Sequence, residues 1–285
     1  MRLEALEVRV DIICTGSGAL ELAESVRTAW DWCSVEPTPE PVSQTGSEAG
    51  AQTRIDADEG GVQRLTVLLD DEPDVVAAQA VQASLFGGDL ATVMDRLSPM
   101  VTRVAVNDRR GDLVMFHACA VADPETGDAV VLYGPSGTGK TTMARTLCTD
   151  FVYLSDETAG VTADLRVVPY VKPLSIIVRP GDTLKEQVSP ARLGLLRPRA
   201  VPYRLRALVQ LRRDPQHQGE AVLEPMATVD ALPELVAQTS YTREMERPLH
   251  RLADLAHRVG GVRRVTYAEA AQVRPCVRAI LDGAA

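Results

Sequence analysis

The chain has 285 residues, of which 45% are hydrophobic, so it can bury the core of one large domain or two small ones. Lys and Arg number 30 against 39 Asp and Glu, and the resulting net charge of −9 disfavours a surface that neutralises a nucleic-acid backbone. No segment approaches the roughly 20 apolar residues of a membrane-spanning helix. Residues 1–18 lack the uninterrupted apolar core of a signal peptide. We therefore expect a cytoplasmic protein that binds neither nucleic acid nor membrane.

The cysteines are odd in number and widely scattered, and none belongs to a C-x-x-C pair. Zinc binding and disulfide redox chemistry are therefore disfavoured. We expect reduced thiols at Cys14, Cys33, Cys119, Cys148 and Cys276.

The first hundred residues predict a small α+β lobe, residues 1–100. Residues 34–61 are rich in Pro, Ser, Glu and Gly and poor in large apolar groups, which predicts a mobile loop inside this lobe. Around it, hydrophobic periodicity predicts a strand at 6–14, a helix at 18–30, a strand at 64–70, and helical sequence over 73–98 that is broken near Gly87 and Gly88.

The remainder, residues 101–285, predicts an α/β nucleotide-binding domain with a helical carboxyl-terminal region. Turn chemistry separates three apolar runs at 101–107, 113–122 and 129–133, which we expect to form consecutive antiparallel strands. Further along, the patterns predict a helix at 141–148, a strand at 151–155, a hairpin within 156–170, strands at 204–213 and 262–267, and helices over most of the last third.

The segment GPSGTGKTT, residues 134–142, satisfies the pattern G-x-x-x-x-G-K-[ST] between a predicted strand and a predicted helix. Glycines let successive backbone N–H groups converge on phosphate oxygens at the start of the helix. A glycine-rich turn that matches by chance is the alternative, which the flanking elements disfavour. We expect the phosphates of ATP or GTP to contact Gly134, Pro135, Ser136, Gly137, Thr138, Gly139, Lys140, Thr141 and Thr142.

In this loop, Lys140 is expected to bridge the β- and γ-phosphates, and the Thr141 hydroxyl is expected to bind Mg²⁺. The segment FVYLSDE places Asp156 only 16 positions after Lys140, which leaves room for one helix, a turn and one strand. We therefore expect this strand to lie beside the strand that enters the loop. Asp156 is expected near the metal and as the base, with Glu157 close behind, although an acidic turn pair would look the same.

His117 lies in an apolar strand, where a histidine is more often a hydrogen-bonded core residue than a catalyst. On this evidence alone its role stays open.

Residues 113–180 together resemble the HPr kinase/phosphorylase superfamily, especially its smaller serine kinases from bacterial biosynthetic clusters. The similarity consists of FHACAV, GPSGTGKTT, LSDE and PYVKPLSI in this order and spacing. The resemblance implies a P-loop kinase core related to phosphoenolpyruvate carboxykinase. It also implies catalytic roles for Lys140, Asp156 and Glu157, and places His117 near the transferred phosphate.

The chain departs from that family in two ways. Its acidic pair is Asp156-Glu157 where two aspartates are usual, which leaves the identity of the base open. The carboxyl-terminal signature for the protein substrate and the hexamer is not recognisable, so HPr is a poor candidate acceptor. Positive charge for the phosphate could come from Lys172, Arg179, Arg199 or Arg204, although arginines on strands and loops are usually solvated.

These observations predict a kinase that uses ATP or GTP with Mg²⁺ and phosphorylates a hydroxyl group. The acceptor would be a Ser or Thr of a peptide or protein, or a small hydroxylated metabolite, and a homo-oligomer is compatible with the sequence. The alternative is a nucleotide-dependent binding or scaffold protein with little phosphotransfer. A motor or transporter ATPase is weaker, because neither an LSGGQ-like signature nor a distant strand ending in Asp-Glu is present.

Overall fold

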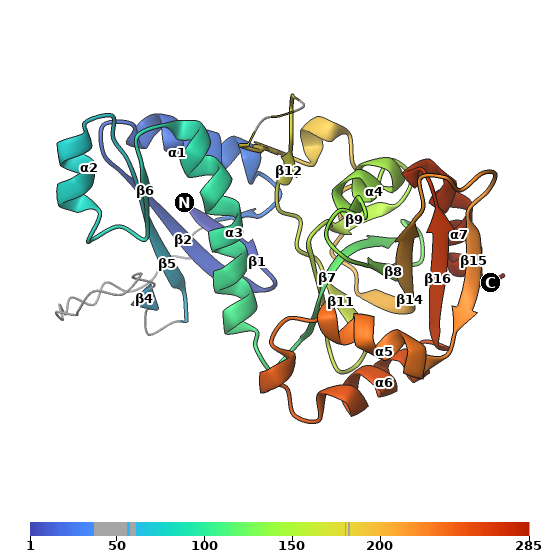
Figure 1. Ribbon diagram of the computed structural model, residues 1–285. Helices are drawn as coiled ribbons and strands as arrows, with labels where there is room; N and C mark the ends of the chain where they lie inside the picture. Colours follow the sequence, from blue (N-terminus) through green and yellow to red (C-terminus); the bar gives the residue numbers. More distant parts are fainter. Residues whose placement is uncertain (37–55, 58–60, 180, 182, 285) are drawn as a thin grey trace. The chain divides into compact units, whose positions relative to one another are not determined.

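The computed structural model describes residues 1–36, 56–57, 61–179, 181 and 183–284 (Figure 1). The chain forms two compact units: unit 1 contains Met1–Asp108 and Lys172–Ser189, and unit 2 contains Arg109–Val171 and Pro190–Ala285. Most of the predicted mobile loop at 34–61 lies outside the described residues. Within the part of the chain that the structure describes, no helix is long and apolar enough to cross a membrane.

Unit 1 is built on a mixed sheet. Its strands are β1 (Arg2–Ala5), β2 (Val8–Thr15), β3 (Ser34–Val35), β4 (Asp56–Ala57), β5 (Gln63–Leu69) and β6 (Leu85–Gly87). They have the order β3-β1-β2-β5-β4, and β6 also pairs with β5. Strands β2, β5 and β6 run parallel, so their carboxyl ends meet at one edge of the sheet.

Helices α1 (Ala19–Ala29) and α3 (Leu90–Asp108) of unit 1 contact each other and the sheet, and α2 (Pro73–Gln79) contacts β5. A separate hairpin, β12 (Leu174–Ile176) with β13 (Glu186–Val188), also belongs to this unit. It is joined to the rest of unit 1 by a hydrogen bond of 2.7 Å from Ser189 Oγ to Asp31 Oδ1.

Unit 2 contains the second sheet, in the order β11-β10-β7-β8-β14-β16-β15, with β9 also paired to β7. Strand β7 is antiparallel to β8, whereas β8, β14 and β16 run parallel. The bounds are β7 (Val114–Ala122), β8 (Asp128–Tyr133), β9 (Val152–Ser155), β10 (Thr158–Val161), β11 (Arg166–Val168), β14 (Tyr203–Arg213), β15 (Val222–Met226) and β16 (Val262–Tyr267).

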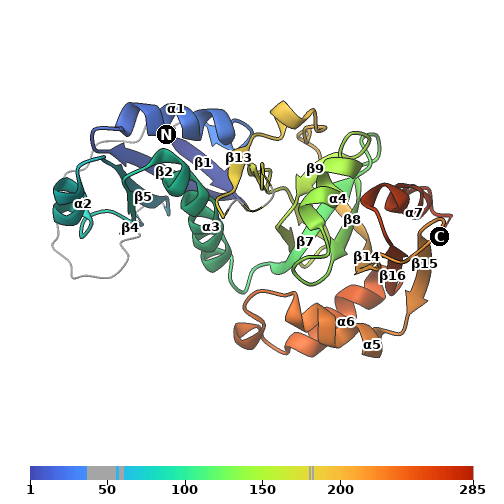
Figure 2. The same cartoon turned by 45° about the horizontal axis from the view of Figure 1, so that its top comes forward.

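Helices cover both faces of this second sheet (Figures 1 and 2). Val131 and Tyr133 of β8 pack into a core with Leu235 and Leu252, which belong to α5 (Thr228–Ala237) and α6 (Pro248–Arg258). Leu132 is buried between them and points to the opposite face, because side chains alternate along a strand. That face is contacted by α4 (Lys140–Leu147) and α7 (Arg274–Leu281).

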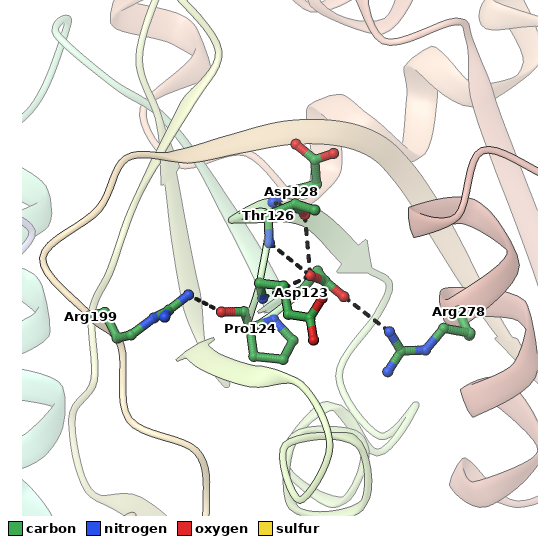
Figure 3. Close-up of polar contacts among 7 residues, drawn as sticks. Asp123, Pro124, Thr126, Asp128, Arg199 and Arg278 are labelled. Atoms are coloured by element: carbon green, nitrogen blue, oxygen red, sulfur yellow. Dashed lines mark hydrogen bonds and ion pairs between the residues drawn. The ribbon is translucent and has the colours of Figure 1, made fainter.

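The turn between β7 and β8 is fixed by the carboxylate of Asp123 (Figure 3). Its Oδ1 accepts the backbone N–H groups of Glu125 and Thr126, each at 2.9 Å, and its Oδ2 accepts Arg278 Nη1 at 3.0 Å. Burial alone would raise the pKa of Asp123, but the hydrogen bonds from Thr126 and Glu125, together with Arg278, lower it. The turn and α7 therefore hold β8 from its amino-terminal end.

Many predicted elements are confirmed, among them the antiparallel pair β7 and β8, helix α4 after the glycine loop and the hairpin β10–β11. The strand expected at 101–107 is wrong, because these residues continue α3 and bury Val101, Val104 and Ala105 at helical spacing. The expected division at residue 100 consequently falls within a helix. Strands β1, β6 and β15 and the hairpin β12–β13 were not predicted.

The expected position of β9 is also wrong. It does not pair with β8 but lies on the other side of β7. Because β7 is antiparallel to both, β8 and β9 point in the same direction and their carboxyl ends reach the same edge. The acidic pair therefore arrives beside the glycine loop although one strand intervenes.

Candidate functional site

The glycine loop follows the carboxyl end of β8 and leads directly into α4. Gly137 and Gly139 both have φ of +86°, a conformation that L side chains rarely adopt. A Cβ on Gly134 would lie 3.1 Å from the carbonyl oxygen of Leu211, so a larger residue would press against β14. The Tyr267 hydroxyl donates a 2.7 Å hydrogen bond to the Thr138 carbonyl and anchors the loop to the end of β16. The loop is thus held from two strands.

The start of α4 offers backbone donors to the loop's concave side. Its N-cap is Gly139, and no side chain forms a capping hydrogen bond there. The first N–H groups of a helix have no partner within the helix, and the helix dipole favours a negative charge beside them. Pro135, Ser136 and Gly137 are exposed, which leaves the loop accessible. This arrangement fits an anionic phosphate group.

Lys140 is buried and turns back onto the loop. Its Nζ donates to the carbonyl oxygens of Gly134 at 2.7 Å and of Pro135 at 3.0 Å. Burial lowers the pKa of this ammonium group, while Cys119, Glu234 and Glu157 act in the opposite direction. An ammonium group carries three donors, and these two contacts hold its positive charge beside the loop where a phosphate would bind.

The hydroxyl of Thr141 joins the loop to the acidic pair. Thr141 Oγ1 donates to Asp156 Oδ2 at 2.9 Å, and Tyr153 OH donates to Asp156 Oδ1 at 2.9 Å. Asp156 is only 3% exposed, so this carboxylate is held inside the protein with a hydroxyl donor on each oxygen. Burial raises the pKa of Tyr153, which therefore keeps its proton and remains a donor.

Glu157 occupies the turn between β9 and β10, where Ser155 Oγ accepts the N–H groups of Glu157 at 3.2 Å and Thr158 at 3.0 Å. The Glu157 carbonyl oxygen accepts the backbone N–H of Ala118 at 3.0 Å. Its side chain is half-buried, unlike that of Asp156. Because β9 ends at Ser155, the two acids lie in a turn and are not restricted to opposite faces of a strand.

His117 lies beside this turn, and its Nδ1 is 3.1 Å from the Glu157 carbonyl oxygen. A carbonyl oxygen can only accept, so Nδ1 carries the proton in this contact and Nε2 keeps its lone pair in the neutral ring. Burial and then the charge of Lys140 lower the pKa of His117, against opposing effects of Glu157 and Asp156. The structure therefore brings His117, Lys140, Asp156 and Glu157 into one region.

Two residues on α5 and its carboxyl-terminal extension were missed from the sequence. The Gln238 carbonyl oxygen accepts the backbone N–H of His117 at 2.7 Å, and Gln238 Nε2 donates to Glu234 Oε1 at 2.9 Å. Glu234 also acts electrostatically on Lys140. In the sequence, Glu234 looks like a solvated residue of an amphipathic helix. Its place near the site follows only from the pairing of residues 238–240 with β7.

The remaining basic candidates do not gather at the loop within unit 2. Arg199 donates to the Pro124 carbonyl oxygen at the β7–β8 turn, and Arg204 pairs in register with Asp128 at the start of β8. Both therefore lie at the end of β8 opposite the loop, about 20 Å away for a strand of this length. Lys172 and Arg179 belong to unit 1. Lys172 is buried, and its Nζ donates to the Pro173 carbonyl oxygen at 3.0 Å.

The residues that could hold a metal are Thr141 and Asp156. A hydroxyl and a carboxylate are hard oxygen ligands, which suit Mg²⁺. Among the described residues, no group of three or more His, Cys, Asp or Glu side chains could hold a metal by itself.

Comparisons with known proteins add little to this geometry. No protein-family model matches the chain, and none of the curated proteins matches it. Among solved structures, the Hpr(Ser) kinase/phosphatase from Coxiella burnetii is similar, with a TM-score of 0.30 and 9% identity over 59% of this chain and 94% of that chain. A similarity of this extent identifies neither the site nor the reaction, which therefore rest on the residues around Lys140.

Proposed function

We propose that this protein is a Mg²⁺-dependent phosphotransferase that moves the γ-phosphoryl group of ATP or GTP to a hydroxyl acceptor. The acceptor is a Ser or Thr of a peptide or protein, or a small hydroxylated metabolite. The observation that carries this proposal is the 2.9 Å hydrogen bond between Thr141 Oγ1 and Asp156 Oδ2. It joins a strand-end carboxylate to the first turn of the helix that follows the glycine loop.

The loop residues bind and orient the nucleotide in this proposal. Backbone N–H groups from Gly137 to Thr141 contact phosphate oxygens, and Lys140 neutralises the charge that develops on the transferred group. Thr141 and Asp156 would hold Mg²⁺, which would supply positive charge to stabilise the transferring phosphoryl group. The contact from Tyr267 to the Thr138 carbonyl keeps the loop in place.

Transfer forms a bond between the acceptor oxygen and the γ-phosphorus and breaks the bond to the β-phosphate oxygen, which leaves with the nucleoside diphosphate. The hydroxyl proton passes to a carboxylate. Both oxygens of Asp156 already accept hydroxyl hydrogen bonds and its side chain is only 3% exposed, whereas the side chain of Glu157 is more accessible to an acceptor. We therefore assign the proton to the half-buried Glu157 and the metal to Asp156, which differs from the order expected from the sequence.

The test is transfer of label from γ-labelled ATP and GTP, with Mg²⁺, to a panel of Ser- and Thr-containing peptides and small alcohols. We expect Lys140→Ala and Asp156→Ala to lower transfer about 100-fold or more, since each removes a group that acts on the transferred phosphate. Lys185→Ala, which removes an exposed lysine of unit 1, is the matched control and should transfer normally.

Transfer that survives both active-site substitutions would overturn the assignment. Binding of nucleotide without transfer to any acceptor would instead favour the nucleotide-dependent binding protein. In that case the double variant Asp156→Asn with Glu157→Gln should keep its affinity for a partner.

A further inference from the structure

Tyr153 supports Asp156 through a hydrogen bond, although no motif in the sequence points to a role for this tyrosine. It lies within the apolar strand β9, three positions before the acid, and is fully buried. Its hydroxyl donates to Asp156 Oδ1 at 2.9 Å, while Thr141 Oγ1 takes Oδ2 at 2.9 Å. The two oxygens of this carboxylate are therefore each held by a different hydroxyl, one from α4 and one from β9.

Tyr133 shows that a buried tyrosine in this unit need not have a hydrogen-bonding partner. It ends β8 immediately before Gly134 and is fully buried, and its hydroxyl oxygen has no hydrogen-bond partner among the residues that the structure describes. Tyr153 differs from Tyr133, because its hydroxyl donates a hydrogen bond to Asp156. Burying a hydroxyl costs free energy unless it forms a hydrogen bond, so the contact explains why a tyrosine is stable at a position that a phenylalanine would also fill.

A carboxylate that accepts one hydrogen bond on each oxygen cannot rotate about its Cβ–Cγ bond without breaking both. Its plane is therefore fixed relative to Thr141. Residues that orient metal ligands in this way affect metal affinity about as strongly as many ligands do, with losses of roughly 10- to 100-fold when they are removed. Tyr153 lies on β9 and Thr141 lies in the first turn of α4, so the carboxylate is held from two different elements.

We propose that Tyr153 is a positioning residue that sets the orientation of the Asp156 carboxylate for Mg²⁺ binding beside the nucleotide. This inference rests on the proposed function, since it assumes that Asp156 and Thr141 form the metal site. Tyr153 does not contact the reacting groups itself. Its substitution should change metal affinity without changing how the loop binds phosphate.

The experiment measures Mn²⁺ binding by electron paramagnetic resonance in the presence of ADP, with Mn²⁺ as the paramagnetic probe for Mg²⁺. Tyr153→Phe should weaken the binding of Mn²⁺ about 10-fold or more and alter the spectrum of the bound ion. Tyr133→Phe is the matched control and should bind Mn²⁺ like the wild type, because it removes an equally buried hydroxyl that has no partner in the described part of the chain. ADP affinity in excess EDTA should be the same in all three proteins.

Unchanged Mn²⁺ affinity and spectrum in Tyr153→Phe would overturn the inference and leave the proposed function standing. Equal losses of ADP affinity with and without metal would also contradict it, because they indicate general damage to the loop. If the wild type binds neither ADP nor Mn²⁺ in the presence of ADP, the proposed function fails and the inference fails with it.

Discussion

The two units each contain a glycine-rich turn from a parallel strand into a helix, and the two turns differ in what the neighbouring acid does. In unit 1, β2 leads through Gly16, Ser17 and Gly18 into α1, and Asp70 follows the adjacent strand β5. Asp70 Oδ2 accepts the backbone N–H of Ser17 at 2.9 Å. In unit 2, Asp156 accepts the side chain of Thr141 at 2.9 Å.

This difference decides which turn can hold an anion. In unit 1 a carboxylate already occupies a backbone donor of the turn, and the sequence after Gly18 begins with Ala19 and Leu20, so no lysine is present. In unit 2 the acid accepts the hydroxyl of Thr141 in the first turn of the helix, and Lys140 opens that helix. A glycine-rich turn before a helix is therefore not by itself a phosphate site.

The largest effect on nucleotide affinity should come from Lys140→Ala. Hydrogen bonds to charged groups contribute about 1.5–3 kcal/mol, so we expect the affinity for Mg·ADP to fall roughly 10- to 100-fold by calorimetry. Lys185→Ala should bind like the wild type. Equal affinity of Lys140→Ala and wild type would place the nucleotide elsewhere.

Changing Asp156 of unit 2 and Asp70 of unit 1 to asparagine should show that only the first acid acts in phosphotransfer. Asp156→Asn should lower phosphotransfer about 100-fold or more, since it removes the charged group beside the expected metal. Asp70→Asn should leave transfer within about twofold and lower only the stability of unit 1, because it weakens a backbone hydrogen bond. Labelled transfer and thermal unfolding are the readouts, and a loss of transfer in Asp70→Asn comparable to that in Asp156→Asn would contradict the contrast.

Replacing one glycine of each turn with alanine should cost different amounts of stability. Gly16 has φ of +91°, and a Cβ there would lie 2.3 Å from the Leu69 carbonyl oxygen, whereas a Cβ on Gly137 would meet nothing within 4 Å. We expect Gly16→Ala to cost about 3 kcal/mol of stability and Gly137→Ala about 1–2 kcal/mol. Both tryptophans, Trp30 and Trp32, lie in unit 1, so their fluorescence reports the unfolding of unit 1, while calorimetry follows both units. The comparison fails if the two variants unfold alike.

The smallest effect concerns acid pH. The hydrogen bond from the Ser17 backbone and then that from Glu72 lower the pKa of Asp70 in the folded protein. A lowered pKa contributes stability above the unfolded value of about 3.9, and this contribution disappears as pH falls through the folded value. The midpoint of unit 1 unfolding should therefore fall more steeply below about pH 4 in the wild type than in Asp70→Asn. Parallel curves would show that the contact carries no pH dependence.

Local sequence signals predicted the parts of the site that lie close together in the chain. The loop, α4 and the acidic pair occupy one strand–helix–strand stretch, so turn chemistry and apolar runs were sufficient. The main error in the fold lies where the predicted helix ended, at residue 98. Helix α3 instead continues through Pro99 to Asp108 and buries Leu97, Val101 and Val104 along one face.

The contacts that cross the sheet could not be predicted. The position of β9 depends on β7 lying between it and β8, which spacing along the chain does not reveal. Tyr153 and Glu234 carry no motif, since one looks like a core residue of a strand and the other like a solvated residue of a helix. Their positions follow from strand pairing and from the attachment of residues 238–240 to β7.

A crystal structure with Mg²⁺ and a non-hydrolysable ATP analogue would show directly whether the glycine loop holds the nucleotide. We expect the γ-phosphate within hydrogen-bonding distance of Lys140 Nζ, and Mg²⁺ bound by Thr141 Oγ1 with Asp156 beside it. A nucleotide bound away from residues 134–142, or a metal that contacts neither Thr141 nor Asp156, would contradict this expectation.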